Sequence, residues 1–263
     1  MRVPLKCISH LRLCVSWHAP MCAPPTYVAD LVTDVLHLLS VTFAELWQQT
    51  FPNGRDPWYC LSSGAVINMV HAYNARSFSA EPSQLTPPIA YDFARLYTNI
   101  PHTLLTTAFS ALVHSCLNFK NARSIRVETT DPPPAKPDYP FTHQAFVSTR
   151  LPNRRYTQHA DRKDTRYLST EDFLHVFSML LAATYIQFGP VLVRQMCGIP
   201  MGISPAPFIA NLFLAWYEYG FLLQQFQPHL QPSAKAVVAR FRYTRRFLDD
   251  LLSLNNPNLQ HLL

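Results

Sequence analysis

The chain has 263 residues, of which 48% are hydrophobic and 14% are charged. This composition can build a folded core, which excludes wholesale disorder. The formal net charge of +6 fits a polyanionic partner, and no uncharged apolar run reaches the roughly 18 residues of a membrane span.

The N-terminal segment and the cysteines indicate an intracellular protein. Residues 1–25 show no clear period and end in two prolines, which is typical of a loose leader. His10, Arg12 and His18 interrupt any signal-peptide core. The six cysteines include no Cys-x-x-Cys pair, so we expect reduced, mostly structural thiols.

Residues 26–88 are expected to be mainly helical. Apolar side chains recur at helical spacing over 26–49, and a second helix is predicted over about 63–75. A turn at 52–54 separates them, and the polar, Pro-rich residues 76–88 form a connector.

A short buried strand is predicted next, over Ile89–Phe93, with the acidic Asp92 inside it. Pro101 then stands near the start of a helix that is expected to run to about residue 118. Proline is tolerated there because its missing N–H would have no helical partner.

Residues 119–168 have the composition of a surface insertion. The run Asp131–Pro134 excludes regular structure locally, although a hairpin around Phe146 is compatible with the pattern. Basic side chains crowd its second half: Arg150, Arg154, Arg155, Arg162, Lys163 and Arg166. Two interpretations stay open, a solvated charged loop or an arm that contacts phosphates.

Ser169 is a good helix cap because acidic residues occupy the first turn that follows it. The elements expected after it are a helix to about residue 187, a strand over 191–195, a loop framed by Gly198 and Gly202, and an apolar helix over about 205–225.

Two adjacent carboxylates, Asp249 and Asp250, follow a strand predicted over 240–247 and precede one over 251–254. An acidic pair between apolar runs is costly to bury, and a divalent cation is the usual compensation. Because neighbours on a strand point to opposite faces, the pair could serve one ion only at a hairpin tip. The alternative is a solvated loop between two strands.

The order of these features matches the palm of template-directed polymerases. An early aspartate, Asp92, is followed by a Gly-framed loop leading into a helix, and then by the Asp249-Asp250 pair. In such palms the early aspartate and the later pair hold two divalent ions that align a 3′-hydroxyl with an α-phosphate.

The amino-acid sequences of three motifs resemble the palm motifs of the reverse transcriptases of Penelope-like retroelements. These are Tyr91–His102 (YDFARLYTNIPH), Gln195–Gly202 (QMCGIPMG) with the helix after it, and Arg246–Pro257 (RFLDDLLSLNNP). The resemblance covers roughly residues 57–263. It implies RNA-directed DNA synthesis from deoxynucleoside triphosphates on an RNA template and a DNA primer, with no membrane partner and a nuclear location.

The resemblance also implies roles at the reaction centre. Asp92 and Asp249 would be the principal ligands of Mg²⁺, or of Mn²⁺ in its place. Asp250 would be the supporting carboxylate, and the carbonyl of Phe93 would face a metal. Tyr97 stands where reverse transcriptases place a steric gate against the ribose 2′-hydroxyl, a clash with the wrong substrate. The alternative for Tyr97 is an ordinary core aromatic.

Further residues would bind the substrate or the nucleic acid. Those implied to lie against the incoming nucleotide are Gln195, Gly198, Pro200, Met201 and Gly202, where glycine permits close backbone approach. Those expected near the nucleic-acid backbone are Arg154, Arg155, Arg245 and Arg246. The alternatives are an ordinary turn for the loop, a basic strand surface for Arg245 and Arg246, and no chemistry for His102.

We therefore expect an α+β fold, a reverse-transcriptase-like palm with a small antiparallel sheet packed on helices. The parts would be a leader at 1–25, helical partial fingers at 26–88, and the palm at 89–263 with the basic, Pro-rich insertion at 119–168. The fingers look abbreviated and the thumb absent, as in a palm-centred fragment.

The chain departs from the family pattern at Ala94-Arg95, which replace the small hydroxylated residues usual there. One alternative is therefore a catalytically inactive nucleic-acid-binding remnant. Another is a structural helical protein in which the aspartate pair is a solvated turn.

Overall fold

The computed structural model describes residues 26–51, 56–60, 62–77, 86–93, 95–130, 142–158, 163–225, 239, 241–257 and 259. The predicted leader, the turn at 52–54, the Pro132–Pro134 run and Arg162 lie outside the described residues.

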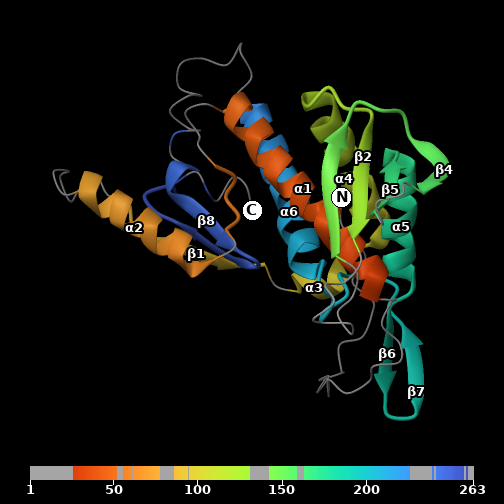
Figure 1. Ribbon diagram of the computed structural model, residues 1–263. Coiled ribbons are helices and arrows are strands. Elements are labelled where there is room, and N and C mark those ends of the chain that lie inside the picture. The colour runs from red at the N-terminus through yellow and green to blue at the C-terminus, as the bar shows by residue number, and fades with distance from the viewer. Residues whose placement is uncertain are drawn as a thin grey trace, which may run out of the picture.

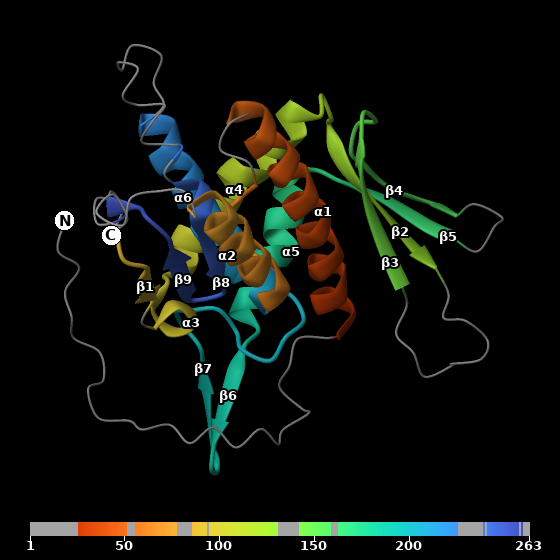
Figure 2. The same ribbon diagram turned by 90° about the vertical axis from the view of Figure 1, so that its left-hand side faces the viewer.

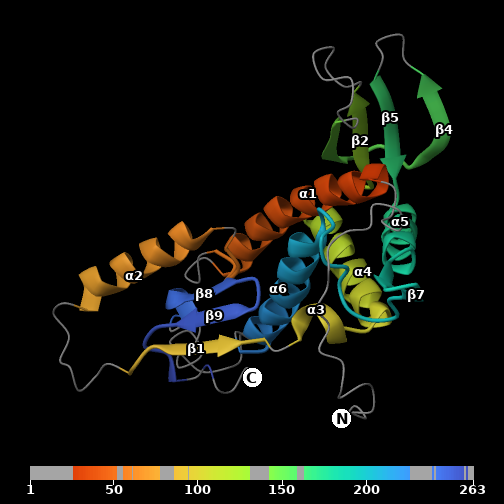
Figure 3. The same cartoon turned by 90° about the horizontal axis from the view of Figure 1, so that it is seen from below.

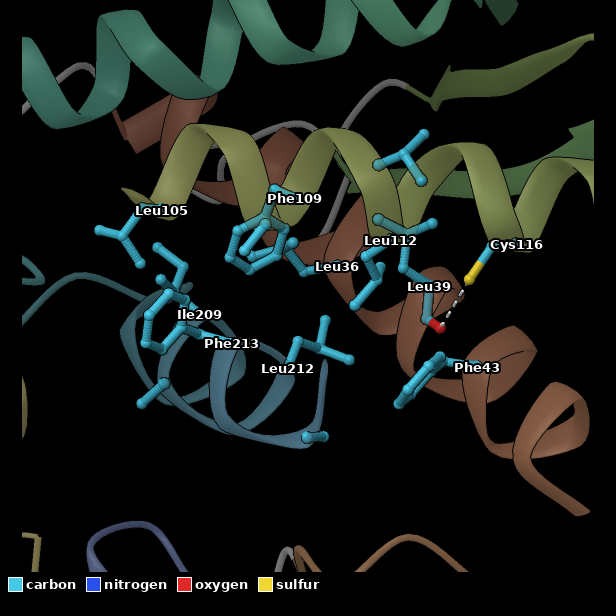
Figure 4. Packing of buried hydrophobic residues seen from close by; sticks show 14 of the residues in the cluster. Leu36, Leu39, Phe43, Leu105, Phe109, Leu112, Cys116, Ile209, Leu212 and Phe213 are labelled. Atoms are coloured by element: carbon cyan, nitrogen blue, oxygen red, sulfur yellow. Dashed lines mark hydrogen bonds between the residues drawn. The ribbon is translucent and has the colours of Figure 1, made fainter. Parts of the chain in front are cut away.

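Four helices form the centre of the fold (Figure 1): α1 (Thr26–Thr50), α4 (His102–Phe119), α5 (Thr170–Ala182) and α6 (Ala206–Gln225). The apolar stripes of α1, α4 and α6 face one another, because their apolar side chains recur every three or four residues. The side chains that converge there are shown in Figure 4: Leu36, Leu39, Phe43, Leu105, Phe109, Leu112, Cys116, Ile209, Leu212 and Phe213.

Cys116 illustrates the structural thiols expected from the sequence. Its side chain is fully buried, and its Sγ donates to the carbonyl oxygen of Leu39 at 4.0 Å. Burial raises the pKa of the Cys116 thiol to about 12, so this cysteine stays protonated and unreactive.

A three-stranded antiparallel sheet carries the two aspartate motifs. Its strand order is β1 (Ile89–Asp92), β9 (Asp250–Ser253), β8 (Thr244–Phe247). Helix α2 (Ser63–Ser77) lies against β8, and the short α3 (Leu96–Asn99) follows β1. The strand expected over 240–247 begins only at Thr244, because Phe241–Tyr243 form a 3₁₀ turn.

Where a surface insertion was expected, four strands form a second sheet. Their order is β3 (Thr142–Ser148), β2 (Ser124–Thr130), β5 (Lys163–Leu168), β4 (Asn153–Gln158), with every pairing antiparallel. The hairpin expected around Phe146 is thus part of a larger sheet. One face packs on the helical core, with Ile125 and Val127 of β2 fully buried in it.

The helix predicted over 169–187 begins as expected and ends early. Ser169 and Asp172 form a reciprocal capping box, with each side chain accepting the other residue's N–H at 3.0 Å. Helix α5 stops at Ala182, and the chain continues as a hairpin of β6 (Tyr185–Phe188) and β7 (Val191–Arg194) around Gly189 (φ 58°). The hairpin projects from the body of the molecule (Figures 1 and 2).

The predicted fold class is confirmed at the level of an α+β chain with small antiparallel sheets on helices. Within the described residues, no helix combines the length and apolarity needed to cross a membrane.

Candidate functional site

The register of β1 and β9 brings the three predicted aspartates to one end of the sheet. Asp92 lies directly opposite Asp250, and the Phe93 N–H donates to the Asp249 carbonyl at 2.9 Å. Since Phe93 and Asp249 form the hydrogen-bonded pair, Asp92 and Asp250 are the adjacent close pair, with Cα atoms about 4.5 Å apart. Two carboxylates 158 positions apart in sequence are therefore cross-strand neighbours.

Strand alternation separates the two faces of this sheet. The open face carries Asp92, Asp250 and Phe247, all exposed, together with the half-buried Arg245. The inner face rests on the helices and carries Leu251 and other buried side chains. The acidic pair thus faces outward, where a substrate could reach it.

The hairpin tip between β8 and β9 is a tight turn through Leu248 and Asp249. Leu248 has φ 55°, in the left-handed region that costs a branched side chain energy. The expectation that the aspartate pair sits at a hairpin tip agrees with this geometry, since Asp250 is the first residue of β9.

These residues offer the hard oxygen ligands that Mg²⁺ prefers, and the ion usually needs only one or two protein carboxylates besides substrate phosphates. In the described part of the chain, however, no group of three or more His, Cys, Asp or Glu side chains is close enough to form a complete metal cage. The Phe93 carbonyl already accepts the Leu96 N–H at 3.1 Å, which leaves one lone pair for another partner. The donor set fits an ion shared with substrate, and does not form a closed protein site.

The prediction that Arg246 lies near the nucleic-acid backbone is wrong. Its side chain is fully buried beneath the sheet and cannot contact a nucleic-acid backbone. Its Nε donates to Glu218 Oε1 at 2.6 Å, and Nη1 and Nη2 donate to the Oδ1 and carbonyl of Asn211, each at 3.0 Å. A buried guanidinium requires such partners, because an unpaired charge there would be very costly.

The same guanidinium reaches the turn that carries Asp249. Arg246 Nη1 also donates to the carbonyl of Leu248 at 2.9 Å. On its backbone, the Arg246 N–H donates to the Trp58 carbonyl at 2.7 Å, and its carbonyl accepts the Cys60 N–H at 2.8 Å. Arg246 therefore connects the hairpin tip with α6 and with the segment before α2.

Sequence reasoning missed the partners of Arg246, although a signal was present. Asn211 and Glu218 are seven residues apart on α6, two helical turns, and so lie on the same face. Two polar residues on the buried face of an otherwise apolar helix need a buried polar partner.

Tyr97 lies near the aspartates. Burial raises the pKa of the Tyr97 phenol, the negative charge of Asp249 raises it further, and the positive charge of Arg246 lowers it. The ring is half-buried, and the Tyr97 carbonyl accepts the Ile199 N–H at 2.8 Å. Tyr97 thus connects the first motif with the second.

The Gly198 loop is packed against the first motif. The Gly198 N–H donates to the Ile100 carbonyl at 2.7 Å, and His102 Nε2 lies 3.0 Å from the Gly198 carbonyl oxygen. Gly198 has φ +88°, and a Cβ there would stand 2.8 Å from Thr98 Cα and collide with the Tyr97 carbonyl. Only glycine fits, so a specific contact, rather than general loop chemistry, explains this residue. The hydrogen bond of His102 was not anticipated.

The remaining predicted nucleotide contacts divide into buried and exposed groups. Pro200 is buried, whereas Met201 is 53% exposed and Gly202 follows it with φ 84°. Gln195 directs its Nε2 to the Cys197 carbonyl at 2.9 Å, which stabilises the loop itself.

The other predicted basic contacts lie apart from one another. Arg245 is on the open face beside the aspartates, and its Nη1 donates to the Thr244 carbonyl at 2.8 Å. Arg154 and Arg155 belong to β4 of the second sheet, and their side chains are outside the described part.

Comparison with known proteins finds similarity in three-dimensional structure and none in sequence. No protein-family model matches the chain, and neither does any curated protein. A solved structure, telomerase from Candida albicans in complex with the TWJ fragment of telomeric RNA, is similar with a TM-score of 0.51 and 14% identity. The similarity covers 89% of this chain and 31% of that chain. At this identity it shows the fold, and the chain corresponds to less than a third of the telomerase chain.

Proposed function

We propose that the chain is the palm-centred part of an RNA-directed DNA polymerase, related to the reverse transcriptases of Penelope-like retroelements. It would transfer deoxynucleotides to a primer 3′-hydroxyl. The observation that carries the proposal is the cross-strand pair of Asp92 and Asp250, with Phe93 bonded to Asp249 beside it. All three sequence motifs meet at this point. The Tyr97 carbonyl accepts a hydrogen bond from the Gly198 loop, and the Tyr97 phenol is close enough to Asp249 for that charge to shift its pKa.

The similarity in fold to telomerase supports a nucleic-acid partner, because that structure is a complex with a fragment of telomeric RNA. A net charge of +6 also suits a nucleic-acid partner. Primer, RNA template and dNTP remain proposed partners of this chain, and the nuclear location remains a prediction.

Asp92, Asp249 and Asp250 would hold Mg²⁺, or Mn²⁺ in its place, with the Phe93 carbonyl as a further oxygen ligand. When bound, the ions would supply alignment of the 3′-hydroxyl with the α-phosphate and neutralise developing charge. Like charges directly opposite on a sheet are destabilising, so a cation between Asp92 and Asp250 would also relieve repulsion in the fold.

The chain's other residues would position the substrate. The Tyr97 ring would exclude a ribose 2′-hydroxyl, because it is half-buried and fixed by its neighbours. The Gly198–Gly202 loop would lie along the nucleotide, and Arg245 on the open face would meet the phosphate backbone. Arg246 would act through the protein, as the buried support of the Asp249 turn.

A second candidate is nucleic-acid binding without turnover. It is favoured by Ala94-Arg95, which stand where the resembled family has small hydroxylated residues. It keeps the fold and the basic surface, and requires neither metal nor dNTP.

Primer extension separates the two candidates. The full chain is incubated with an RNA template annealed to a labelled DNA primer, dNTPs and Mg²⁺ or Mn²⁺, alongside Asp249→Asn and Asp92→Asn variants. The polymerase proposal predicts extension by the wild type only, and none in EDTA. Binding of the primer–template by all three proteins with no extension by any would support the second candidate instead.

A further inference from the structure

The four-stranded sheet β3-β2-β5-β4 has an outer face that the polymerase proposal does not use. Its inner face is defined by Ile125 and Val127 of β2, which belong to the core, and by Val147 and Leu168, which pack against it. The side chains between them must point the other way.

Three of these outward side chains form one row across three strands. Arg126 of β2 is paired with Phe146 of β3 on one side and with Tyr167 of β5 on the other. Neither aromatic ring belongs to the core cluster, and both are half-buried. An aromatic–cation–aromatic row therefore crosses the sheet.

Each ring has an arginine within cation–π distance. The Arg126 guanidinium carbon lies 4.7 Å from the centre of the Phe146 ring, and that of Arg150 lies 5.8 Å from the centre of the Tyr167 ring. Arg150 also donates to the Tyr167 hydroxyl at 3.2 Å and is exposed. The Arg126 side chain is 37% exposed, and its ion pair with Glu128 at 3.4 Å offsets part of the charge.

We propose that this outer face, the Phe146–Arg126–Tyr167 row with Arg150, is a binding platform for single-stranded nucleic acid. Every base has an apolar π-face that stacks on aromatic rings and on guanidinium planes, while arginine also attracts the phosphates. Since adjacent strands are about 4.8 Å apart, Phe146 and Tyr167 are about 10 Å apart, enough for each ring to take its own base. The arginines of this face and the chain's net charge of +6 favour a polyanionic partner.

The platform is separate from the aspartate site. Figures 2 and 3 both place the four-stranded sheet on the opposite side of α1 from the β1-β9-β8 sheet. Binding there requires neither the carboxylates nor a metal. The inference therefore does not rest on the proposed polymerase activity, and Asp249→Asn should leave it unchanged.

The test measures binding of fluorescein-labelled oligouridylate and oligodeoxythymidylate of about 12 nucleotides, a length within the range of single-strand sites, by fluorescence anisotropy in EDTA. Phe146→Leu and Tyr167→Leu remove the π-face but keep an apolar side chain. Each is expected to weaken binding about 5- to 100-fold, as loss of one base stack does. Phe146→Tyr and Tyr167→Phe are matched controls that keep the ring, and they should bind within about twofold of the wild type.

Arg150→Gln tests the electrostatic part. It is expected to reduce the slope of log affinity against log salt by about 0.7, the value for one phosphate contact on a single strand. The two leucine variants should leave this slope unchanged. An unchanged slope in Arg150→Gln together with unchanged affinity in both leucine variants would overturn the platform.

If a leucine variant does not fold, photocrosslinking to the wild-type protein shows where single-stranded RNA binds. Wild-type protein is crosslinked to 4-thiouridine RNA, and the attached peptides are identified by mass spectrometry. The proposal predicts attachment in Thr142–Ser148 and Lys163–Leu168. Attachment confined to other peptides would contradict it.

Discussion

Arg246 and Glu218 form a buried ion pair, with Nε and Oε1 2.6 Å apart and the two side chains 0% and 5% exposed. The pair joins β8 to α6 directly beneath the strands that carry the aspartates. The bond from Arg246 to the Leu248 carbonyl extends this support to the turn at Asp249. The geometry of the candidate site thus depends on a charge pair that never meets solvent.

Replacing Glu218 with Gln should destabilise the protein by roughly 3–5 kcal/mol, because removal of one partner leaves the Arg246 charge buried and uncompensated. Urea unfolding measures the effect. The double variant Arg246→Met/Glu218→Leu is the control and should lose much less, because it leaves no charge behind. A single variant as stable as the wild type would mean that the pair is not buried in solution.

Gly198→Ala tests the contact between the second motif and the first. The new methyl group would meet Thr98 and the Tyr97 carbonyl, and φ +88° is unfavourable for alanine, so a loss of about 2 kcal/mol or more is expected. Gly220→Ala is a matched control within α6, where an added Cβ meets nothing within 4 Å. It should stabilise the helix by up to about 1 kcal/mol. Equal effects of the two substitutions on thermal unfolding would rule out the specific contact.

Tyr97→Ala should relax selection against ribonucleotides if the ring is the steric gate. The measurement is the ratio of kcat/KM for a dNTP to that for the matching rNTP, compared with wild type. Tyr97→Phe keeps the ring and should keep the ratio. Unchanged selectivity in Tyr97→Ala would assign Tyr97 to packing alone.

Asp34 on α1 should make the free energy of unfolding depend on pH. The pKa of its carboxyl is raised to about 6, mainly by burial and also by the negative charge of Asp30, while His37 acts in the opposite direction. Folding therefore favours the protonated form. The unfolded chain releases that proton near 3.8, so stability falls as the pH rises from about 4 to about 6.

Asp34→Asn should remove this loss. Relative to wild type, the variant should gain roughly 1 kcal/mol at pH 7, a figure reduced for the partial exposure of the group, and nothing at pH 3. Urea unfolding at the two pH values gives the comparison. A gain of the same size at both would assign the effect to something other than titration.

The elements that the sequence predicted well are those whose periodicity is uninterrupted. The apolar repeats of α1 and α6 placed both helices within two residues of their observed bounds, 26–50 and 206–225. The strand predicted over Ile89–Phe93 is observed over Ile89–Asp92, and the hairpin at Asp249 lies where acidic residues interrupt two short apolar runs.

What the sequence could not supply depended on distant pairing. Val127 lies between Arg126 and Glu128, so the sequence of β2 looks polar. That its Ile125 and Val127 are buried in the core depends on packing that the sequence alone does not show. Arg245 and Arg246 look equivalent in sequence, yet strand alternation places one on the open face and buries the other. The packing of Gly198 against Thr98 joins segments 100 positions apart, which no local pattern encodes.

Template-directed nucleotidyl transfer at Asp92, Asp249 and Asp250, as proposed above, is tested most directly by single-nucleotide incorporation. Four RNA templates that differ only in the first unpaired base are each offered all four dNTPs separately. Wild-type protein should add only the complementary deoxynucleotide on each template, whereas Asp92→Asn and Asp249→Asn should add none while binding the primer–template as tightly. Incorporation that ignores the template base, or that persists in both variants, would contradict it.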